Sequence, residues 1–105
     1  MVNQADTIAE IKSIAKFFLP GSEVILFGSR ARGEESPGSD YDFLIISREP
    51  LSDRQRLTLQ ARIRKSLAQK LILADILIYS GKDIEKKKRL PGHIVRSAMK
   101  DGVRI

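Results

Sequence analysis

Residues 24–46 read VILFGSRARGEESPGSDYDFLII, and this stretch decides how the chain folds. The apolar run at residues 24–27 ends at Gly28, which favours a short buried strand over a helix too short to stand alone. Residues 33–40 concentrate turn-forming residues and predict a surface loop. Residues 41–46 are rich in aromatic and β-branched side chains and predict a second strand. Because only a few residues separate the two strands, no full helical crossover joins them, and we expect a mixed sheet.

A helix is predicted on each side of this stretch. Upstream, residues 7–10 have the form of a capping box that starts at Thr7, and apolar residues then recur at helical spacing until Pro20-Gly21 stops the pattern. Downstream, Ser52 and Gln55 form a second capping box. The longest predicted helix follows it, with apolar residues at fourfold spacing: Leu59, Ile63, Leu67 and Leu71.

The remainder of the chain adds one strand and two shorter helices. Residues 72–79 predict a third strand whose apolar run is interrupted only by Asp75, and Ser80-Gly81 turns the chain. A short charged helix is expected from Asp83, and residues 91–102 predict a last helix that begins with proline and ends with glycine. This order predicts an α/β (α+β) fold, with a small mixed sheet of about three to four strands covered by helices on at least one face.

Length and composition point to a single soluble domain spanning residues 1–105. No apolar run approaches the roughly 18 to 20 residues that cross a bilayer, and the N-terminal residues lack the pattern of a signal peptide. We therefore expect a cytoplasmic protein without a membrane partner. The chain has no cysteine, which excludes disulfide frameworks, thiolate zinc sites and cysteine nucleophiles.

Charge is divided unevenly along the chain. Residues 1–47 hold four Lys/Arg and seven Asp/Glu, whereas residues 48–105 hold fifteen and six, so the two parts carry about −3 and +9. A basic half of this kind suits phosphates, nucleic acid or an acidic partner, although it is equally typical of solvated helix faces. Nucleic acid is not favoured, because no reading motif is present and few aromatic side chains are available for base stacking.

Gly28 and Ser29 are candidate phosphate-binding residues. Glycine after a buried strand lets a ligand approach the backbone, the residues that follow could form a helical turn with free N–H groups, and the serine adds a hydroxyl donor. The sequence is neither a Walker loop nor a dinucleotide fingerprint. Taken alone, the pair would suit a plain turn.

Three aspartates complete the candidate site. Asp40 and Asp42 stand two apart and should share one face of the second strand, where a Mg²⁺ or Mn²⁺ ion would offset their repulsion. Asp75 lies in an apolar run, where an ionised carboxylate is costly without a partner or metal. If the third strand lies beside the second, Asp75 joins the pair as a metal ligand or catalytic base. The alternatives are that Asp40 caps a turn, Asp42 is merely exposed and Asp75 faces water on an edge strand.

Together, GSRARG at residues 28–33, SDYD at residues 39–42 and the later strand aspartate resemble the polymerase-beta-type nucleotidyltransferase superfamily, and within it the minimal nucleotidyltransferase family. The resemblance covers nearly the whole chain. It implies that Asp40 and Asp42 bind two divalent ions, one carrying the triphosphate of ATP, while Asp75 binds the second ion and helps deprotonate an acceptor hydroxyl. It also implies that Gly28 and Ser29 hold the β- and γ-phosphates.

The same resemblance implies a partner. Minimal nucleotidyltransferases pair with a helical HEPN-type RNase toxin, so the chain would be an antitoxin that binds the toxin, transfers AMP to one of its tyrosines, or does both. The apolar positions on its helices could support a hetero- or homo-oligomer. A non-catalytic nucleotide-binding antitoxin, a nucleic-acid-binding protein and a small-molecule transferase are the alternatives. We assign no catalytic role to Arg30, Arg32 or His93, and we expect Tyr41 to point away from the acids and pack.

Overall fold

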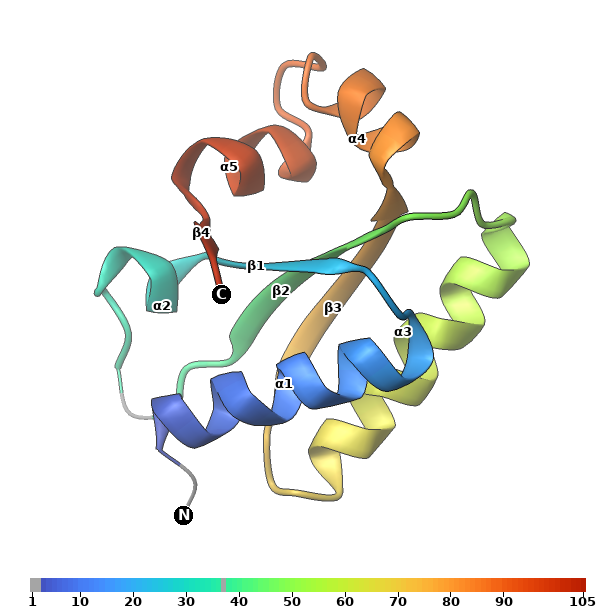
Figure 1. The fold of residues 1–105 in the computed structure, drawn as a ribbon. Helices are drawn as coiled ribbons and strands as arrows, with labels where there is room; N and C mark the ends of the chain where they lie inside the picture. Colours follow the sequence, from blue (N-terminus) through green and yellow to red (C-terminus); the bar gives the residue numbers. More distant parts are fainter. Residues whose placement is uncertain (1–2, 37) are drawn as a thin grey trace.

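A four-stranded sheet lies between two layers of helices in the computed structural model, which describes residues 3–36 and 38–105 (Figure 1). None of the helices in these described ranges is long and apolar enough to cross a bilayer. The elements along the chain are α1 (Gln4–Phe18), β1 (Glu23–Phe27), α2 (Ser29–Arg32), β2 (Tyr41–Ser47), α3 (Asp53–Ala68), β3 (Ala74–Ser80), α4 (Gly81–Lys87), α5 (Ile94–Asp101) and β4 (Val103–Arg104).

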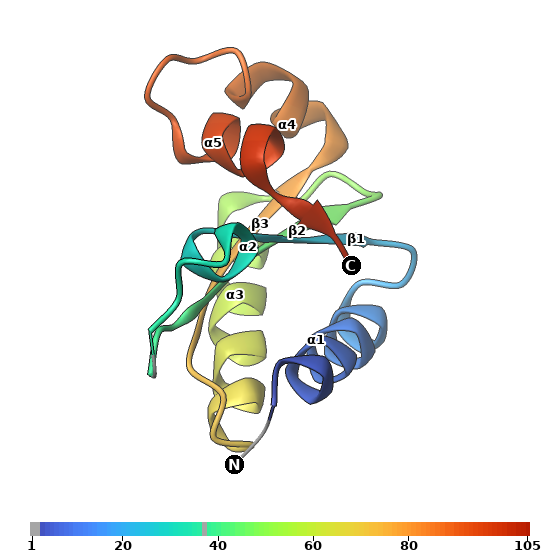
Figure 2. The same cartoon turned by 90° about the vertical axis from the view of Figure 1, so that its left-hand side faces the viewer.

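The strand order across the sheet is β3-β2-β1-β4. The β1 strand pairs antiparallel with both β2 and β4, whereas β2 and β3 run parallel and are joined through α3. The prediction of a mixed sheet is therefore confirmed, and so is the α/β fold class. Helices α1 and α3 cover one face of the sheet, and α4 and α5 cover the other (Figure 2).

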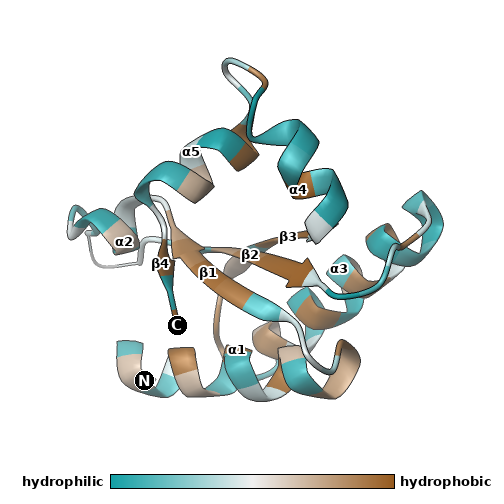
Figure 3. Cartoon of the chain, turned by 45° about the horizontal axis from the view of Figure 1, so that its top comes forward, coloured by the Kyte–Doolittle hydropathy of each residue, from teal (hydrophilic) through white to brown (hydrophobic). Residues whose placement is uncertain are grey.

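Side chains of the central strand β2 alternate between two apolar cores. Phe43 and Ile45 face α1 and α3, while Leu44 faces α4 and α5, and all three are fully buried. Burial on both faces explains why this strand reads as a continuous apolar run. In Figure 3 most of β1 and β2 is brown, the hydrophobic end of the scale, whereas the helices carry both hydrophilic and hydrophobic segments. The first core is the larger one, and Ile11, Ile63 and Leu67 supply its helical side.

The start of α1 differs from the prediction. The helix begins at Gln4, and its cap is Asn3, whose Oδ1 accepts a hydrogen bond of 2.8 Å from the Asp6 backbone N–H. The capping box starting at Thr7 is wrong, because Thr7 lies within the helix and is 1% exposed on its buried face. Asparagine is among the strongest N-cap residues, so the helix extends one turn further upstream.

The predicted capping box of α3 is confirmed, since Ser52 and Gln55 exchange side chain to backbone hydrogen bonds of 2.9 and 3.1 Å. Leu71, however, does not belong to the helix. The helix ends at Ala68, and Leu71 has a φ of 63° and an exposure of 85%. Ile72 packs in the core in its place, because the left-handed residue turns the chain back towards the sheet.

Gln60 of α3 reaches the outer edge of the sheet. Its Oε1 accepts a hydrogen bond of 3.1 Å from the backbone N–H of Ile78 in β3 and one of 3.3 Å from Arg56. Gln60 is buried, so its amide group satisfies a strand donor that no neighbouring strand reaches. This contact fastens α3 to the edge strand.

The C-terminal elements follow the prediction with three adjustments. The third strand starts at Ala74 instead of residue 72, and α4 starts at Gly81 instead of Asp83, capped by the Ser80 hydroxyl. The last helix, α5, starts after its cap His93 instead of at residue 91. The last residues form β4, which pairs with β1 through Ile25 and Leu26. A two-residue strand is too short to show alternation, so no pattern of residues predicted it.

Candidate active site

The predicted site residues meet at one edge of the sheet, where β1 ends and the parallel strands β2 and β3 begin. In the strand register Phe27 is the partner of Asp42, and Asp42 is the partner of Asp75. Gly28 follows Phe27 directly, and Asp40 directly precedes β2. Three separate segments of the chain therefore bring their candidate residues to one place.

Gly28 lies in close contact with Asp42. It has a φ of 75°, and a Cβ atom at this position would lie 2.2 Å from Oδ2 of Asp42. Only glycine combines this backbone conformation with so close an approach of a carboxylate. The carbonyl oxygen of Gly28 accepts hydrogen bonds from the backbone N–H groups of Ala31 and Arg32, which start the short helix α2 at Ser29.

Asp42 and Asp75 lie on the sheet face that carries α4 and α5. Side chains alternate between the two faces along each strand, and the next residues, Phe43 and Ile76, belong to the core on the opposite face. Burial raises the pKa of the Asp42 carboxyl, the charges of Asp75 and Asp40 raise it further, and Arg32 lowers it. Asp42 is half-buried, which rules out the alternative that it is merely exposed. The charges of Asp75 and Asp40 therefore both act on the carboxyl of Asp42.

Asp75 departs from the prediction in its surroundings. It is exposed on the edge strand β3, so the cost of a buried charge that its apolar neighbours suggested does not arise. Its alternating neighbours Ala74 and Ile76 are buried, because α3 covers their face of the strand. The apolar sequence around Asp75 suggested uniform burial, but Leu73, which precedes Ala74, is 64% exposed.

The donor set fits a hard divalent cation in charge and atom type. Three carboxylates are present, and oxygen is the donor that Mg²⁺ and Mn²⁺ prefer. Across residues 3–36 and 38–105 no basic side chain forms an ion pair with any of the three. In the same ranges, however, no three acidic or histidine side chains lie in an arrangement that could already hold a metal ion. Asp40, Asp42 and Asp75 are thus neighbours without a preformed cage.

Two other predictions concern residues beside the acids. Tyr41 points away from them as expected: it is 7% exposed, lies in the core under α1 and α3, and stacks on Phe43 with ring centroids 5.7 Å apart. His93 has a structural role, since its Nδ1 accepts a hydrogen bond of 3.1 Å from the Val95 backbone N–H and caps α5. Its ring also meets Tyr79 edge-on.

Sequence reasoning gave no role to Arg30, whose contacts are extensive. Its Nε and Nη2 donate to the carbonyl oxygen of Ser39 at 2.9 and 2.8 Å, and its guanidinium lies 4.1 Å from the centroid of the Tyr41 ring. Arg32 is exposed and pairs with Glu34 at 3.1 Å. In the sequence, the only sign of these contacts was that Arg30 directly follows the Gly28-Ser29 pair.

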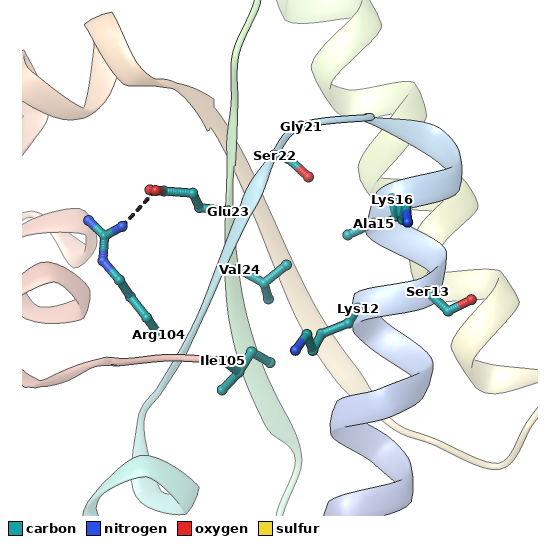
Figure 4. A pocket seen from close by; sticks show the side chains of 10 residues that line it. All are labelled: Lys12, Ser13, Ala15, Lys16, Gly21, Ser22, Glu23, Val24, Arg104 and Ile105. Atoms are coloured by element: carbon teal, nitrogen blue, oxygen red, sulfur yellow. Dashed lines mark ion pairs between the residues drawn. The ribbon is translucent and has the colours of Figure 1, made fainter.

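A groove of about 670 Å³ lies elsewhere, between α1 and the edge formed by β1 and β4 (Figure 4). Lys12 and Lys16 line its α1 side, and the Arg104–Glu23 ion pair, with a separation of 2.7 Å, borders the strand side. None of the five candidate residues lines it. This groove holds neither the paired acids nor the Gly-Ser turn, so we do not assign the active site to it.

A family model of the nucleotidyltransferase domain matches residues 8–105. The chain belongs to the nucleotidyltransferase domain family. The family predicted from GSRARG, SDYD and the third aspartate is therefore confirmed. A search of curated proteins found no match to this nucleotidyltransferase.

Solved structures with the same fold include toxin-antitoxin complexes. A crystal structure of a toxin-antitoxin with AMP-PNP shares 16% identity over 91% of this chain and 69% of its own, with a TM-score of 0.61. A tri-AMPylated Shewanella oneidensis HEPN toxin in complex with MNT antitoxin shares 14% identity over 97% and 71%, with a TM-score of 0.61. A putative nucleotidyltransferase from Sulfolobus solfataricus shares 22% identity over 93% and 80%, with a TM-score of 0.60. These matches agree with the minimal nucleotidyltransferase fold.

Proposed function

We propose that this nucleotidyltransferase transfers AMP from ATP to a tyrosine hydroxyl of a HEPN-type helical toxin and thereby acts as its antitoxin. The observation that carries the proposal is the strand register that places Asp42 beside Asp75, with Gly28 in contact with the Asp42 carboxylate. A turn that can hold phosphates and a pair of acids that can hold a cation thus adjoin. We take residues 1–105 as one catalytic domain.

Gly28 and Ser29 are the proposed nucleotide-binding residues. Gly28 presents a backbone without a side chain at the turn, and Ser29 offers its hydroxyl and the first N–H of α2 to the β- and γ-phosphates. The toxin-antitoxin crystal structure with AMP-PNP, which shares this fold, supports a triphosphate as ligand. We propose ATP as the substrate.

Asp40, Asp42 and Asp75 are the proposed ligands of Mg²⁺ or Mn²⁺. A bound divalent ion would supply charge neutralisation at the triphosphate and at the attacking oxygen. The raised pKa of Asp42 supports this role, because a cation between the carboxylates would relieve the repulsion that contributes to the shift. Asp75 is exposed, so an acceptor from solvent can approach it, as a proposed base requires.

The transfer forms one bond and breaks one. The acceptor oxygen attacks the α-phosphorus of ATP, the bond from that phosphorus to the bridging oxygen of the β-phosphate breaks, and pyrophosphate leaves. Asp75 accepts the proton of the acceptor hydroxyl. Asp42, in register with Asp75 and against Gly28, lies between the proposed base and the proposed phosphate turn. The product is an acceptor that carries AMP through a phosphodiester bond.

The proposed acceptor follows from the family and the neighbouring structures. The HEPN toxin of Shewanella oneidensis is AMPylated in its complex with the MNT antitoxin, which has the same fold as this chain. The basic half of this chain, about +9 over residues 48–105, would complement an acidic partner surface. Binding and transfer could then both contribute to neutralising the toxin.

The test uses ATP labelled at the α-phosphate, Mg²⁺ and a co-purified HEPN-type toxin. Wild type and the control Glu49→Gln, which removes an exposed charge after β2, are expected to label the toxin, and Asp42→Asn and Asp75→Asn are not. Labelling should disappear when the toxin tyrosines are replaced by phenylalanine. If the toxin binds wild type but no label moves, the catalytic proposal fails and the non-catalytic antitoxin takes its place.

A further inference from the structure

Arg30 holds both neighbours of Asp40. Two nitrogen atoms of its guanidinium donate to the carbonyl oxygen of Ser39 at 2.9 and 2.8 Å, and its Cζ atom lies over the ring of Tyr41, 4.1 Å from the ring centroid. Ser39 and Tyr41 directly flank Asp40 in the sequence. The side chain of Arg30 therefore restrains the backbone on each side of a proposed metal ligand.

This restraint is braced against the core. Tyr41 is 7% exposed, stacks on Phe43 at 5.7 Å, and donates its backbone N–H to the carbonyl oxygen of Leu73 at 3.0 Å. A guanidinium that stacks on a fixed ring is itself fixed in orientation. Lysine would keep the charge but lose the planar contact and the paired donors.

Arg30 also belongs to α2, which starts at Ser29. We propose that Arg30 is a positioning residue that keeps Asp40 at a fixed place relative to the Gly28–Ser29 turn. The proposal rests on the proposed function, because it assigns Arg30 a purpose within the same site. Its donors are directed to Ser39 and its face to Tyr41, so it acts through the protein and does not touch the reacting atoms.

Arg32 is the contrasting case two residues later. It is exposed, and its Nε donates to Glu34 at 3.1 Å; in the described ranges no hydrogen bond or ion pair joins it to Ser39, Asp40 or Tyr41. An exposed pair of this kind contributes little to order. The two arginines of GSRARG thus differ in their surroundings, and only Arg30 links the turn to Asp40.

The first test needs neither ATP nor metal. Amide hydrogen exchange is measured in wild type, Arg30→Lys and Arg54→Lys, the last altering an exposed arginine of α3. In Arg30→Lys the amides of Ser39 and Tyr41 should exchange on the order of 10-fold faster, since each reports a hydrogen bond next to the restraint. Exchange in α3 should not change. Equal exchange at Ser39 and Tyr41 in all three proteins would overturn the proposal.

The second test measures AMP transfer against Mg²⁺ concentration. Arg30→Lys should lower kcat roughly 10- to 100-fold and raise the Mg²⁺ concentration for half-maximal rate, because a displaced Asp40 carboxylate would bind Mg²⁺ less well. A merely structural loss would lower the folded fraction and leave the Mg²⁺ dependence of the folded protein unchanged. Should Arg30→Lys fail to fold, Tyr41→Leu removes the stacking face and should shift the Mg²⁺ dependence in the same direction.

Two failures can be told apart. If wild type transfers no label, the proposed function fails, and the catalytic purpose of Arg30 fails with it, whereas hydrogen exchange still decides whether the restraint exists. If wild type is active and Arg30→Lys matches it in both kcat and Mg²⁺ dependence, the positioning role is refuted while the proposed function stands.

Discussion

Replacing Asp42 by asparagine should stabilise the fold while abolishing transfer. The side chain keeps its size, but the half-buried charge beside Asp75 and Asp40 is removed. Paired strands lie about 4.8 Å apart, so two carboxylates repel by roughly 0.9 kcal/mol at the dielectric constant of water and by roughly 3.5 kcal/mol at an effective value of 20. The site is open to solvent, and Arg32 attracts Asp42 in wild type, so we expect a gain of about 1 kcal/mol.

The gain is measured by thermal unfolding without divalent ions at pH 7. About 1 kcal/mol corresponds to a Tm increase of roughly 4 to 8 °C for a domain of about 100 residues. Glu49→Gln is the control, since it removes one negative charge that follows β2, beyond the end of the strand opposite to the acids. With Mg²⁺ present at ten times its Kd, wild type should gain ~1.4 kcal/mol and Asp42→Asn much less, so that the difference between them shrinks or reverses.

The stability difference between Asp42→Asn and wild type should also depend on pH. The pKa of Asp42 in the folded state is raised above its ordinary value of 3.8, so ionisation of this carboxyl destabilises the fold. The advantage of Asp42→Asn should be complete above the raised pKa and should disappear as the pH falls through that pKa towards 3.8. A Tm of Asp42→Asn at or below that of wild type at pH 7, or an equal rise in Glu49→Gln, would refute the reasoning.

Three further substitutions, each with a comparison variant, test the site and its supports. Gly28→Ala should lower transfer about 100-fold, because its Cβ would displace Asp42; Gly33→Ala, with a similar φ of 71° and nothing within 4 Å, isolates backbone strain and should keep most activity. Asn3→Ala should cost about 1 kcal/mol of stability in urea unfolding, and Asn3→Asp should not, if Asn3 is the cap of α1. His93→Ala should cost a similar amount, and His93→Asn less, with transfer per folded molecule unchanged; a loss of transfer in folded His93→Ala would contradict the capping role.

The sequence predicted those features whose signal is local. The apolar run before Gly28, the turn-rich loop and the capping box at Ser52 each encode their structure within a few residues, and all three are observed, the loop in its described residues 33–36 and 38–40. The mixed sheet followed from loop length alone. The shared face of Asp40 and Asp42 stays a prediction, because Asp40 precedes β2.

Other features depend on contacts between distant residues. Leu71 continued the fourfold spacing of α3 but turns out of the helix, because packing of Ile72 against the sheet determines where the helix ends. Asp75 looked buried, although only the tertiary arrangement leaves its end of β3 open. The contact between Gly28 and Asp42 required the antiparallel pairing of β1 with β2, and the restraint by Arg30 required the path of the intervening loop. No pattern in a single segment specifies either of them.

The hydrogen bond from Ile78 to Gln60 has a consequence for self-association. An edge strand with free N–H groups is a template on which another chain can add a strand and seed aggregation. On β3 the side-chain amide of Gln60 occupies the donor of Ile78, and the helix that carries it covers this part of the edge. The opposite edge, β4, has only two residues. An added strand would therefore find the Ile78 donor already occupied on β3 and no more than two residues to pair with on β4.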